Sequence, residues 1–418
     1  MHPPPRCAVV AAALIRHTTT TTTLLRPAIL KTTSRAAVSL PPRSVQAASP
    51  PRLQSRTMAS SSSCSSSRGN ANGLSKLPSS PIRLLRTVPA LRLWRRPHLL
   101  DHRTVALVPT MGALHAGHLS LIRQAARENH HVVVSIYVNP AQFGIAEDLD
   151  SYPKTWDSDV AQLVKLDREL ADDGQNLGRI SAVFAPTTQE MYPGGFPGQE
   201  IDSKGSFVTI TPVGERLEGR TRPTFFRGVA TVCMKLFNIV QPERVYFGQK
   251  DVQQTVVIKR LVRDFAMPVE VVIGRTERDP GDGLALSSRN VYLGERRRGR
   301  ATVLYEALRA AEGVYKRGER RRGVILGVAN MLVQDVLREE SRKGPEERVR
   351  FELDYISLAD PDTMEEIEVV DPAKGGILSG AIKMLPVEKA REGEDLGHSG
   401  GPAVRLIDNI ILEPEEKN

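Results

Sequence analysis

The chain has 418 residues and a formal net charge of +9, but ten of its 57 Lys and Arg residues and none of its 48 Asp and Glu residues lie in residues 1–80. The remainder is close to neutral, which argues against a basic stripe that binds nucleic acid. No apolar run approaches the length that spans a bilayer, so we expect no membrane segment.

Residues 1–80 have the composition of a targeting leader. They are rich in Arg, Ser and Thr and contain no acidic residue, which is typical of transit peptides that cannot bury enough apolar surface to fold alone. We therefore expect a disordered leader that directs the protein to mitochondria. Two alternatives stay open: residues 8–15 could be the apolar part of a secretory signal, and initiation at Met58 would give a cytoplasmic form. Beyond the leader only Cys233 remains, so no internal disulfide is expected there.

From about Pro81 the chain alternates between apolar runs and helical patterns, and its length predicts two domains plus extra segments. The spacing of Val88, Leu91 and Trp94 indicates an opening helix. Buried strands are expected at 105–108, 132–138, 182–185, 244–247 and 269–273, and helices at 118–129, 157–171, 228–240, 251–265 and 295–317. This alternation predicts an α/β fold with a doubly wound parallel sheet, whose ligands bind beyond the carboxyl ends of the strands.

The first motif joins the strand at 105–108 to a helix through a Pro109–Gly112 turn. His115 and His118 stand three residues apart where that helix begins, so both imidazoles can face one point. The free N–H groups and the positive end of the helix dipole make this point attractive to phosphate, and both rings are mostly uncharged donors near neutral pH. Two surface histidines would be the ordinary explanation of this spacing alone, but the strand, turn and helix start favour a nucleotide site.

The strand at 132–138 leads into a second polar segment. Pro140 stops the strand, and Gln142 offers an amide donor and acceptor at the edge of the same site. The acidic residues of the following 147–153 segment could hold Mg²⁺, although a solvated loop is the commoner explanation.

Two arginine-rich segments allow more than one interpretation. Arg220, Arg222 and Arg227 lie in a loop before a helix, where they could close as a lid on phosphate or carboxylate or remain solvated. Segment 316–323 is interpreted as a junction between helices with a solvated basic face rather than a nucleic-acid site.

Two further motifs complete the candidate site. Lys250 follows the strand at 244–247 and suits a phosphate. Asp251 and Gln254 fit a capping box for the next helix as well as they fit ligand binding. The hydroxyls and guanidinium of residues 287–289 can wrap the phosphate tail of a nucleotide, although alone they indicate only a turn before a helix.

Over roughly residues 81–412 the chain resembles the pantothenate synthetase (pantoate–β-alanine ligase) family of HxGH nucleotidyltransferases. The motifs PTMGALHAGH, NPAQF, EDLDSYP, AVFAP, FRGVAT, FGQKDVQQ, DGLALSSRN and RLIDN occur in that family's order. The resemblance implies a Rossmann-like domain for ATP and pantoate at 81–275 and a smaller α+β C-terminal lid domain at 276–418. It also implies an ATP- and Mg²⁺-dependent, homodimeric ligase of pantoate and β-alanine.

The resemblance further implies a role for each matching residue. His118 is the general acid, and His115, Lys250 and Arg289 act with it on the phosphates. Asp251 faces the ribose, and Gln142 and Gln254 hold pantoate. The implied ATP-binding residues are Met111, Gly112, Ala113, Leu114, His115, Ala116, Gly117, His118, Gly248, Gln249, Lys250, Asp251, Leu286, Ser287, Ser288 and Arg289. The implied reaction forms pantoyl-adenylate and pyrophosphate, after which the amine of β-alanine expels AMP.

The chain departs from the family pattern in a few places. Asp157-Ser158-Asp159 replaces a run of acidic residues, so no metal ligands are assigned. Residues 279–281 contain an extra residue, and Glu277 stands where an apolar residue near adenine is usual. Extra residues around 167–178 and 390–402 are expected to be surface insertions.

Two other functions are alternatives to the ligase activity. Another HxGH-type nucleotidyltransferase would use the same phosphate clamp but gives no reason for NPAQF or the Gln253-Gln254 pair. A catalytically inactive scaffold would be expected to lose the clamp, whereas both histidines, Lys250 and Arg289 are present.

Overall fold

The computed structural model describes residues 75–145, 147, 149–196 and 198–415, all of which belong to one compact unit. Most of the predicted leader therefore lies outside the described residues. Its last residues do not: Ser75–Lys76 form a strand and Leu77 is buried, so the folded part extends before the predicted boundary at residue 80. In the part described, no helix has the length and apolar character needed to cross a membrane.

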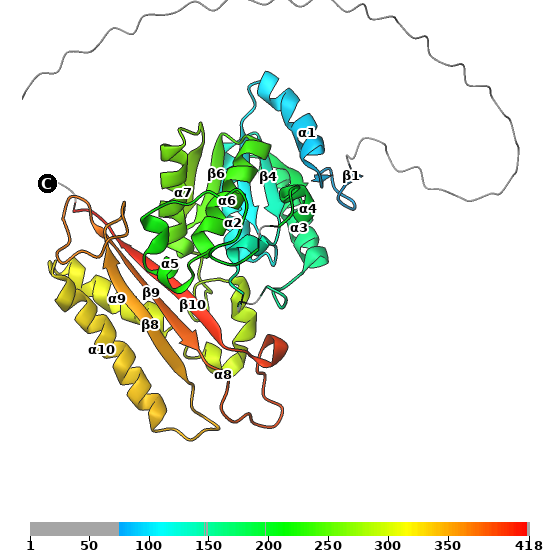
Figure 1. Cartoon of the computed structure of the whole chain (residues 1–418). Helices are drawn as coiled ribbons and strands as arrows, with labels where there is room; N and C mark the ends of the chain where they lie inside the picture. Colours follow the sequence, from blue (N-terminus) through cyan, green and yellow to red (C-terminus); the bar gives the residue numbers. More distant parts are fainter. Residues whose placement is uncertain (1–74, 146, 148, 197, 416–418) are drawn as a thin grey trace, which may run out of the picture. The chain divides into compact units, whose positions relative to one another are not determined.

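A seven-stranded sheet organises the larger part of the molecule, in the order β1-β2-β5-β4-β3-β6-β7 (Figure 1). Only β1 and β2 pair antiparallel; the other neighbours are parallel. All five predicted strands are present, with their ends shifted by a few residues. The structure adds β1 and β2, which were not predicted. The strands are β1 (Ser75–Lys76), β2 (Arg83–Leu85), β3 (Val105–Thr110), β4 (His131–Ile136), β5 (Arg179–Phe184), β6 (Arg244–Gly248) and β7 (Glu270–Gly274).

Helices cover both faces of this sheet. One hydrophobic core lies under α1 (Val88–Leu100), α6 (Phe225–Val240) and α7 (Val252–Asp264) and includes Leu107 of β3. The other lies under α2 (Ala116–Glu128) and α3 (Trp156–Asp173) and includes Ala106 and Val108. Successive side chains of a strand point to opposite faces, so β3 contributes to both cores. The predicted doubly wound α/β fold is confirmed.

A smaller antiparallel sheet follows, in the order β10-β9-β8 (Figure 1). Its strands are β8 (Phe351–Ala359), β9 (Gly376–Met384) and β10 (Val404–Leu412), and α9 (Val303–Lys316) and α10 (Arg322–Ser341) pack on it. The short elements are α4 (Thr188–Met191), α5 (Glu218–Thr221), α8 (Gly294–Arg298) and the 3₁₀ turns η1 (Pro140–Gln142), η2 (Val213–Glu215), η3 (Gln249–Asp251), η4 (Ser288–Tyr292) and η5 (His398–Gly400).

The single helix predicted at 295–317 is wrong, because the chain breaks between α8 and α9. Gly299 ends α8, and glycine has a low helix propensity. The buried guanidinium of Arg297 also fixes the short helix by donating to the carbonyls of Leu293 (2.9 Å) and Pro402 (2.8 Å).

The two segments predicted to be surface insertions have different structures, and the predicted helix junction is present. Residues 167–178 are not a surface insertion throughout, because α3 continues to Asp173 and buries Asp167 and Leu170. Residues 390–402 are largely exposed, as expected. Residues 316–323 join α9 to α10, which confirms the predicted helix junction.

Candidate functional site

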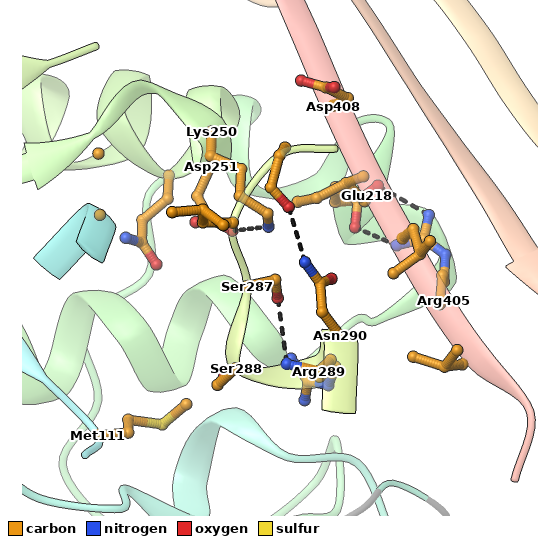
Figure 2. Close-up of a pocket in the computed structure, with 18 of the residues that line it drawn as sticks. Met111, Glu218, Lys250, Asp251, Ser287, Ser288, Arg289, Asn290, Arg405 and Asp408 are labelled. Carbon is orange, nitrogen blue, oxygen red and sulfur yellow. Dashed lines mark hydrogen bonds and ion pairs between the residues drawn. The ribbon is translucent and has the colours of Figure 1, made fainter. Parts of the chain in front are cut away.

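A cavity of about 990 Å³ lies beyond the carboxyl ends of β3, β4 and β6, where Thr110, Tyr137 and Gly248 line it. Its opposite wall comes from residues 284–290 and from β10 (Figure 2). The predicted site residues that line it are Met111, His115, Gly117, His118, Gln142, Gly248, Lys250, Asp251, Gln254, Leu286, Ser287, Ser288 and Arg289. Segments far apart in the sequence thus meet where the fold predicts a ligand site.

Five residues assigned to ATP do not line the cavity: Gly112, Ala113, Leu114, Ala116 and Gln249. The first three form the turn between β3 and α2, in which Gly112 has φ +84° and Leu114 is buried. A Cβ at Gly112 would lie 3.0 Å from a carboxylate oxygen of the neighbouring helix α3. These residues shape the turn rather than the cavity wall.

Asp159 supplies that carboxylate and holds the turn in place. Its two oxygens accept the backbone N–H groups of Ala113 (3.0 Å) and Leu114 (2.8 Å), and Thr155 Oγ1 donates to it at 3.1 Å. Asp159 is 1 % exposed. The sequence interpretation considered it only as part of an acidic cluster and missed this role, because nothing local links it to a turn so far upstream.

The two histidine rings lie against each other where α2 begins, with centroids 4.1 Å apart and planes tilted by 41°. His115 caps the helix: its Nδ1 accepts the N–H of Gly117 at 3.2 Å, so the neutral ring carries its proton on Nε2. Burial and Lys250 lower the pKa of His115 to about 4, while burial, His115 and Lys250 lower that of His118 to about 3. Both rings are neutral at pH 7, in agreement with the sequence prediction.

His118 carries a buried ring nitrogen, Nδ1, that has no hydrogen-bond partner among the residues the structure describes. A buried polar atom without a partner is costly. The residue also lines the cavity, and its neutral ring suits a hydrogen bond to a bound ligand.

Lys250 and Asp251 form the end of the cavity wall that follows β6. Lys250 Nζ lies 3.9 Å from Asp251 Oδ1, so the two side chains form a loose pair. Of the two interpretations left open for Asp251, the capping box is not formed, because its side chain makes no hydrogen bond to the first turn of α7. Gln254 lines the cavity, whereas Gln253 is buried and donates to the carbonyl of Val213 at 2.8 Å. Only the second glutamine is available to a ligand.

Residues 287–289 form the facing wall, just before and within η4. Ser287 Oγ accepts the N–H of Arg289 at 3.3 Å, and Ser288 Oγ lies 3.2 Å from the hydroxyl of Tyr152. The guanidinium of Arg289 lies 5.8 Å from the centre of the Tyr152 ring. Figure 2 shows Lys250, Ser287 and Arg289 around the same space. Two hydroxyls, an ammonium, a guanidinium and two neutral imidazoles therefore converge on one region.

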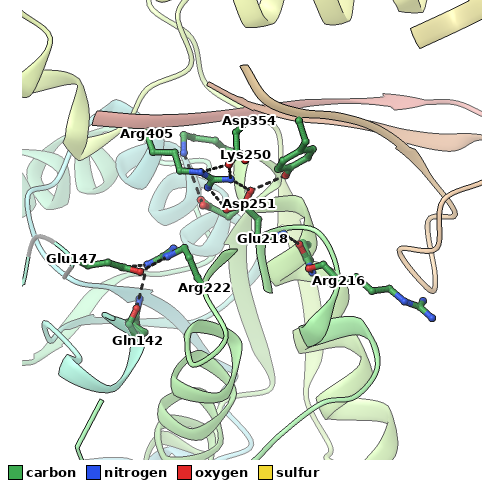
Figure 3. A network of polar contacts seen from close by, with 11 residues as sticks. Gln142, Glu147, Arg216, Glu218, Arg222, Lys250, Asp251, Asp354 and Arg405 are labelled. Atoms are coloured by element: carbon green, nitrogen blue, oxygen red, sulfur yellow. Dashed lines mark hydrogen bonds and ion pairs between the residues drawn. The ribbon is translucent and has the colours of Figure 1, made fainter. Parts of the chain in front are cut away.

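The three loop arginines do not act as one lid. Arg220 is exposed and does not line the cavity, and Arg227 donates to the carbonyl of Ile201 at 2.6 Å. Arg222 alone reaches the cavity, where its Nε donates to Glu147 at 2.8 Å and its Nη2 to the backbone carbonyl of Gln142 at 3.3 Å (Figure 3).

Strand β10 connects the smaller sheet to this site through residues that the sequence interpretation did not assign. Arg405 Nη2 donates to Glu218 at 2.7 Å and pairs with Asp354 at 2.7 Å (Figure 3). Glu218 is 6 % exposed. Asn409 Nδ2 donates to the backbone carbonyl of Lys250 at 2.9 Å. The only signal for these contacts was the RLIDN motif.

Glu277 also lines the cavity, and its carboxylate accepts a hydrogen bond from Ser120 of α2 at 2.7 Å. Among the described residues, no group of three or more His, Cys, Asp or Glu side chains could hold a metal ion. The oxygens of Asp159 are taken up by backbone N–H groups.

Comparison with known proteins matches residues 83–411 to the family model described as Pantoate-beta-alanine ligase. A pantothenate synthetase of Roseiflexus castenholzii is 42% identical over 329 residues, which cover 79% of this chain and 100% of the relative. The crystal structure of pantothenate synthetase from Thermus thermophilus has a TM-score of 0.62 and 37% identity, covering 80% of this chain and 100% of that one. Pantoate-beta-alanine ligase from Francisella tularensis, solved as a complex with Beta-gamma ATP and Beta-alanine, has a TM-score of 0.54 and 28% identity, covering 78% and 97%.

Proposed function

The chain belongs to the pantoate–β-alanine ligase family, and we propose how its own residues perform that family's reaction. The enzyme condenses pantoate with β-alanine and converts ATP into AMP and pyrophosphate. The observation that carries the assignment of residues is the convergence of His115, His118, Lys250 and residues 287–289 on one cavity beyond the strand ends.

In the first step the pantoate carboxylate attacks the α-phosphate of ATP. A P–O bond forms to the acyl oxygen while the bond to pyrophosphate breaks. Lys250 and Arg289 carry the positive charge that phosphate oxygens need, and His118 donates a hydrogen bond as negative charge builds on the leaving group. Gln142 and Gln254 hold pantoate through their amides, both of which line the cavity. The neutral state of the histidines suits donation without a fixed charge.

In the second step the amine of β-alanine attacks the activated carbonyl. A C–N bond forms, the C–O bond to AMP breaks, and the amine loses a proton. No protein nucleophile is needed. Cys233 lines the cavity, but burial raises the pKa of its thiol to about 12, so it carries no thiolate at neutral pH and is unsuited to form an acyl-enzyme.

We extend the proposal to the ligands and the assembly. The Francisella tularensis complex supports ATP and β-alanine as substrates of the same cavity. We propose that Mg²⁺ enters with ATP, because Mg²⁺ is commonly held by substrate phosphates with few protein ligands. The assembly we propose is a homodimer, as the family resemblance implies.

ATP–pyrophosphate exchange tests this function in the full-length protein. We expect exchange only when pantoate is present, and steady AMP formation only when β-alanine is added as well. Exchange that depends on a nucleoside monophosphate instead would favour another HxGH-type nucleotidyltransferase. Absence of exchange with every substrate would favour an inactive scaffold.

A further inference from the structure

Arg222 is a cation in the cavity wall that the adenylation step does not use. We propose that it binds the carboxylate of β-alanine and so selects the second substrate. This inference rests on the proposed function, because it assigns one more group of the same reaction. β-Alanine carries a carboxylate that does not react and persists in the product, so the cavity needs a cation apart from those that bind phosphate.

Each of the other cationic side chains in the cavity wall is either assigned to another group or exposed at the rim of the cavity. Lys250 belongs to the phosphate end with the two histidines, whose pKa values it lowers. Arg405 is held by two carboxylates, those of Glu218 and Asp354. Arg278 does not line the cavity, and both oxygens of Asp408 hold it at 2.6 and 2.9 Å.

Two more cations in the wall, Arg275 and Lys383, are exposed. Arg289 completes the phosphate clamp beside Ser287. Arg222, with a side chain that is 19% exposed, is left as the cation within the wall on the side of the pantoate residues.

The guanidinium of Arg222 is held in a fixed plane. Its Cζ lies 3.7 Å from the ring centre of Phe225, which is a close cation–π stack. Nε and Nη2 donate to the two carboxylate oxygens of Glu147, and Nη2 also donates to the carbonyl of Gln142. Within the part of the chain that the structure describes, Nη1 has no hydrogen-bond partner, and it is not a buried atom. A rigid guanidinium with a donor to spare suits recognition of a carboxylate.

Arg222 also lies at the right end of the cavity. Its Nη2 contacts the backbone of Gln142, the residue proposed to hold pantoate, so the guanidinium adjoins the acyl group that β-alanine attacks (Figure 3). Two carbons separate the amine of β-alanine from its carboxylate. A carboxylate on Arg222 can therefore leave the amine directed at the acyl carbonyl, and an amine without a carboxylate loses this positioning.

Glu147 is the natural competitor for the incoming carboxylate. Its two carboxylate oxygens already accept from Nε and Nη2 of Arg222, so the carboxylate of β-alanine must bind through Nη1 or displace Glu147. Neutralising Glu147 should then strengthen β-alanine binding, whereas a purely structural ion pair would be damaged by loss of either partner. The two interpretations predict opposite effects of the same substitution.

The experiment compares Arg222→Gln, Arg222→Lys and Glu147→Gln in the full chain, with Arg220→Gln as the matched control because Arg220 is exposed and outside the cavity. Arg222→Gln should raise the KM for β-alanine about ten- to hundredfold, the typical effect of losing a charged hydrogen bond. Pantoate-dependent ATP–pyrophosphate exchange should stay within about twofold of the wild type. Arg222→Lys should have a smaller effect on the same KM, and Glu147→Gln should lower it.

A carboxylate-free amine gives the second readout. Turnover of n-propylamine should be equally poor in the wild type and in Arg222→Gln, so the preference for β-alanine over n-propylamine should collapse. A raised KM for pantoate in the exchange assay with an unchanged KM for β-alanine would overturn the inference. So would a Glu147→Gln enzyme that behaves like Arg222→Gln. Lack of pantoate-dependent exchange in the wild type would instead reject the proposed function.

Discussion

Replacing Asp159 by Asn tests whether the turn before α2 is held by this buried carboxylate. The carboxylate accepts two backbone N–H groups, at 3.0 and 2.8 Å. An asparagine keeps one accepting oxygen but turns an NH₂ group towards the other N–H. Since a hydrogen bond to a charged group contributes about 1.5–3 kcal/mol, we expect a loss of about 2–4 kcal/mol. At about 2–4 °C per kcal/mol for a larger domain, Tm should fall by roughly 4–16 °C.

The same substitution should reduce catalysis. The turn carries His115 and leads into the helix with His118, and a displacement of about 1 Å in a reacting site can cost about 10²-fold in rate. We therefore expect kcat to fall about ten- to hundredfold in steady-state assays. Asp157→Asn is the matched control, because Asp157 is an exposed carboxylate in the same helical turn. If Asp159→Asn matched this control in both Tm and kcat, the turn would not depend on the carboxylate.

Three further predictions can be tested separately. His118→Ala should lower kcat about 10²–10³-fold with little change in the KM for pantoate. Gln142→Ala should instead chiefly raise the KM for pantoate. A near-normal kcat of the His118→Ala enzyme would show that the histidine pair is not catalytic. Burial and His98 lower the pKa of His131 from 6.5 to about 4. Between these two pH values the unfolded chain binds a proton at His131 that the folded chain does not, so the free energy of unfolding falls as the pH is lowered from 6.5 to about 4. In His131→Gln this fall should be smaller when Tm is measured against pH. Residues 1–80 fused to a reporter should direct it to mitochondria, and an entirely cytosolic reporter would reject that proposal.

The part of the site that the sequence predicts best is the part built from local patterns. The strand, glycine turn and helix around His115 and His118 are continuous in the chain, and their periodicity is visible without any partner. The alternation of strands and helices is likewise local, and it predicts the sheet whose carboxyl ends carry the cavity. The HxxH spacing, Lys250 and residues 287–289 are brought together by this topology alone.

Contacts between distant segments leave no such pattern. Asp159 and Ala113 are 46 residues apart, and Arg405 and Glu218 are 187 residues apart. Neither pair has a spacing that a helix or strand would reveal. The capping box shows a related effect: a motif can be present in the sequence while tertiary contacts direct its side chain elsewhere. The Asp251 side chain lies near Lys250 and makes no hydrogen bond to the first turn of α7.

One strand of the smaller sheet links the two ends of the reaction site. Near one end of β10, Asn409 donates to the backbone carbonyls of Gln249 (2.8 Å) and Lys250 (2.9 Å), which fixes the segment that carries the lysine. Near the other, Arg405 holds Glu218, and α5 runs from Glu218 directly towards Arg222. A displacement of this strand would therefore disturb the phosphate clamp and the proposed β-alanine subsite together. The smaller sheet thus contributes part of the cavity wall and also holds the segment that carries Lys250.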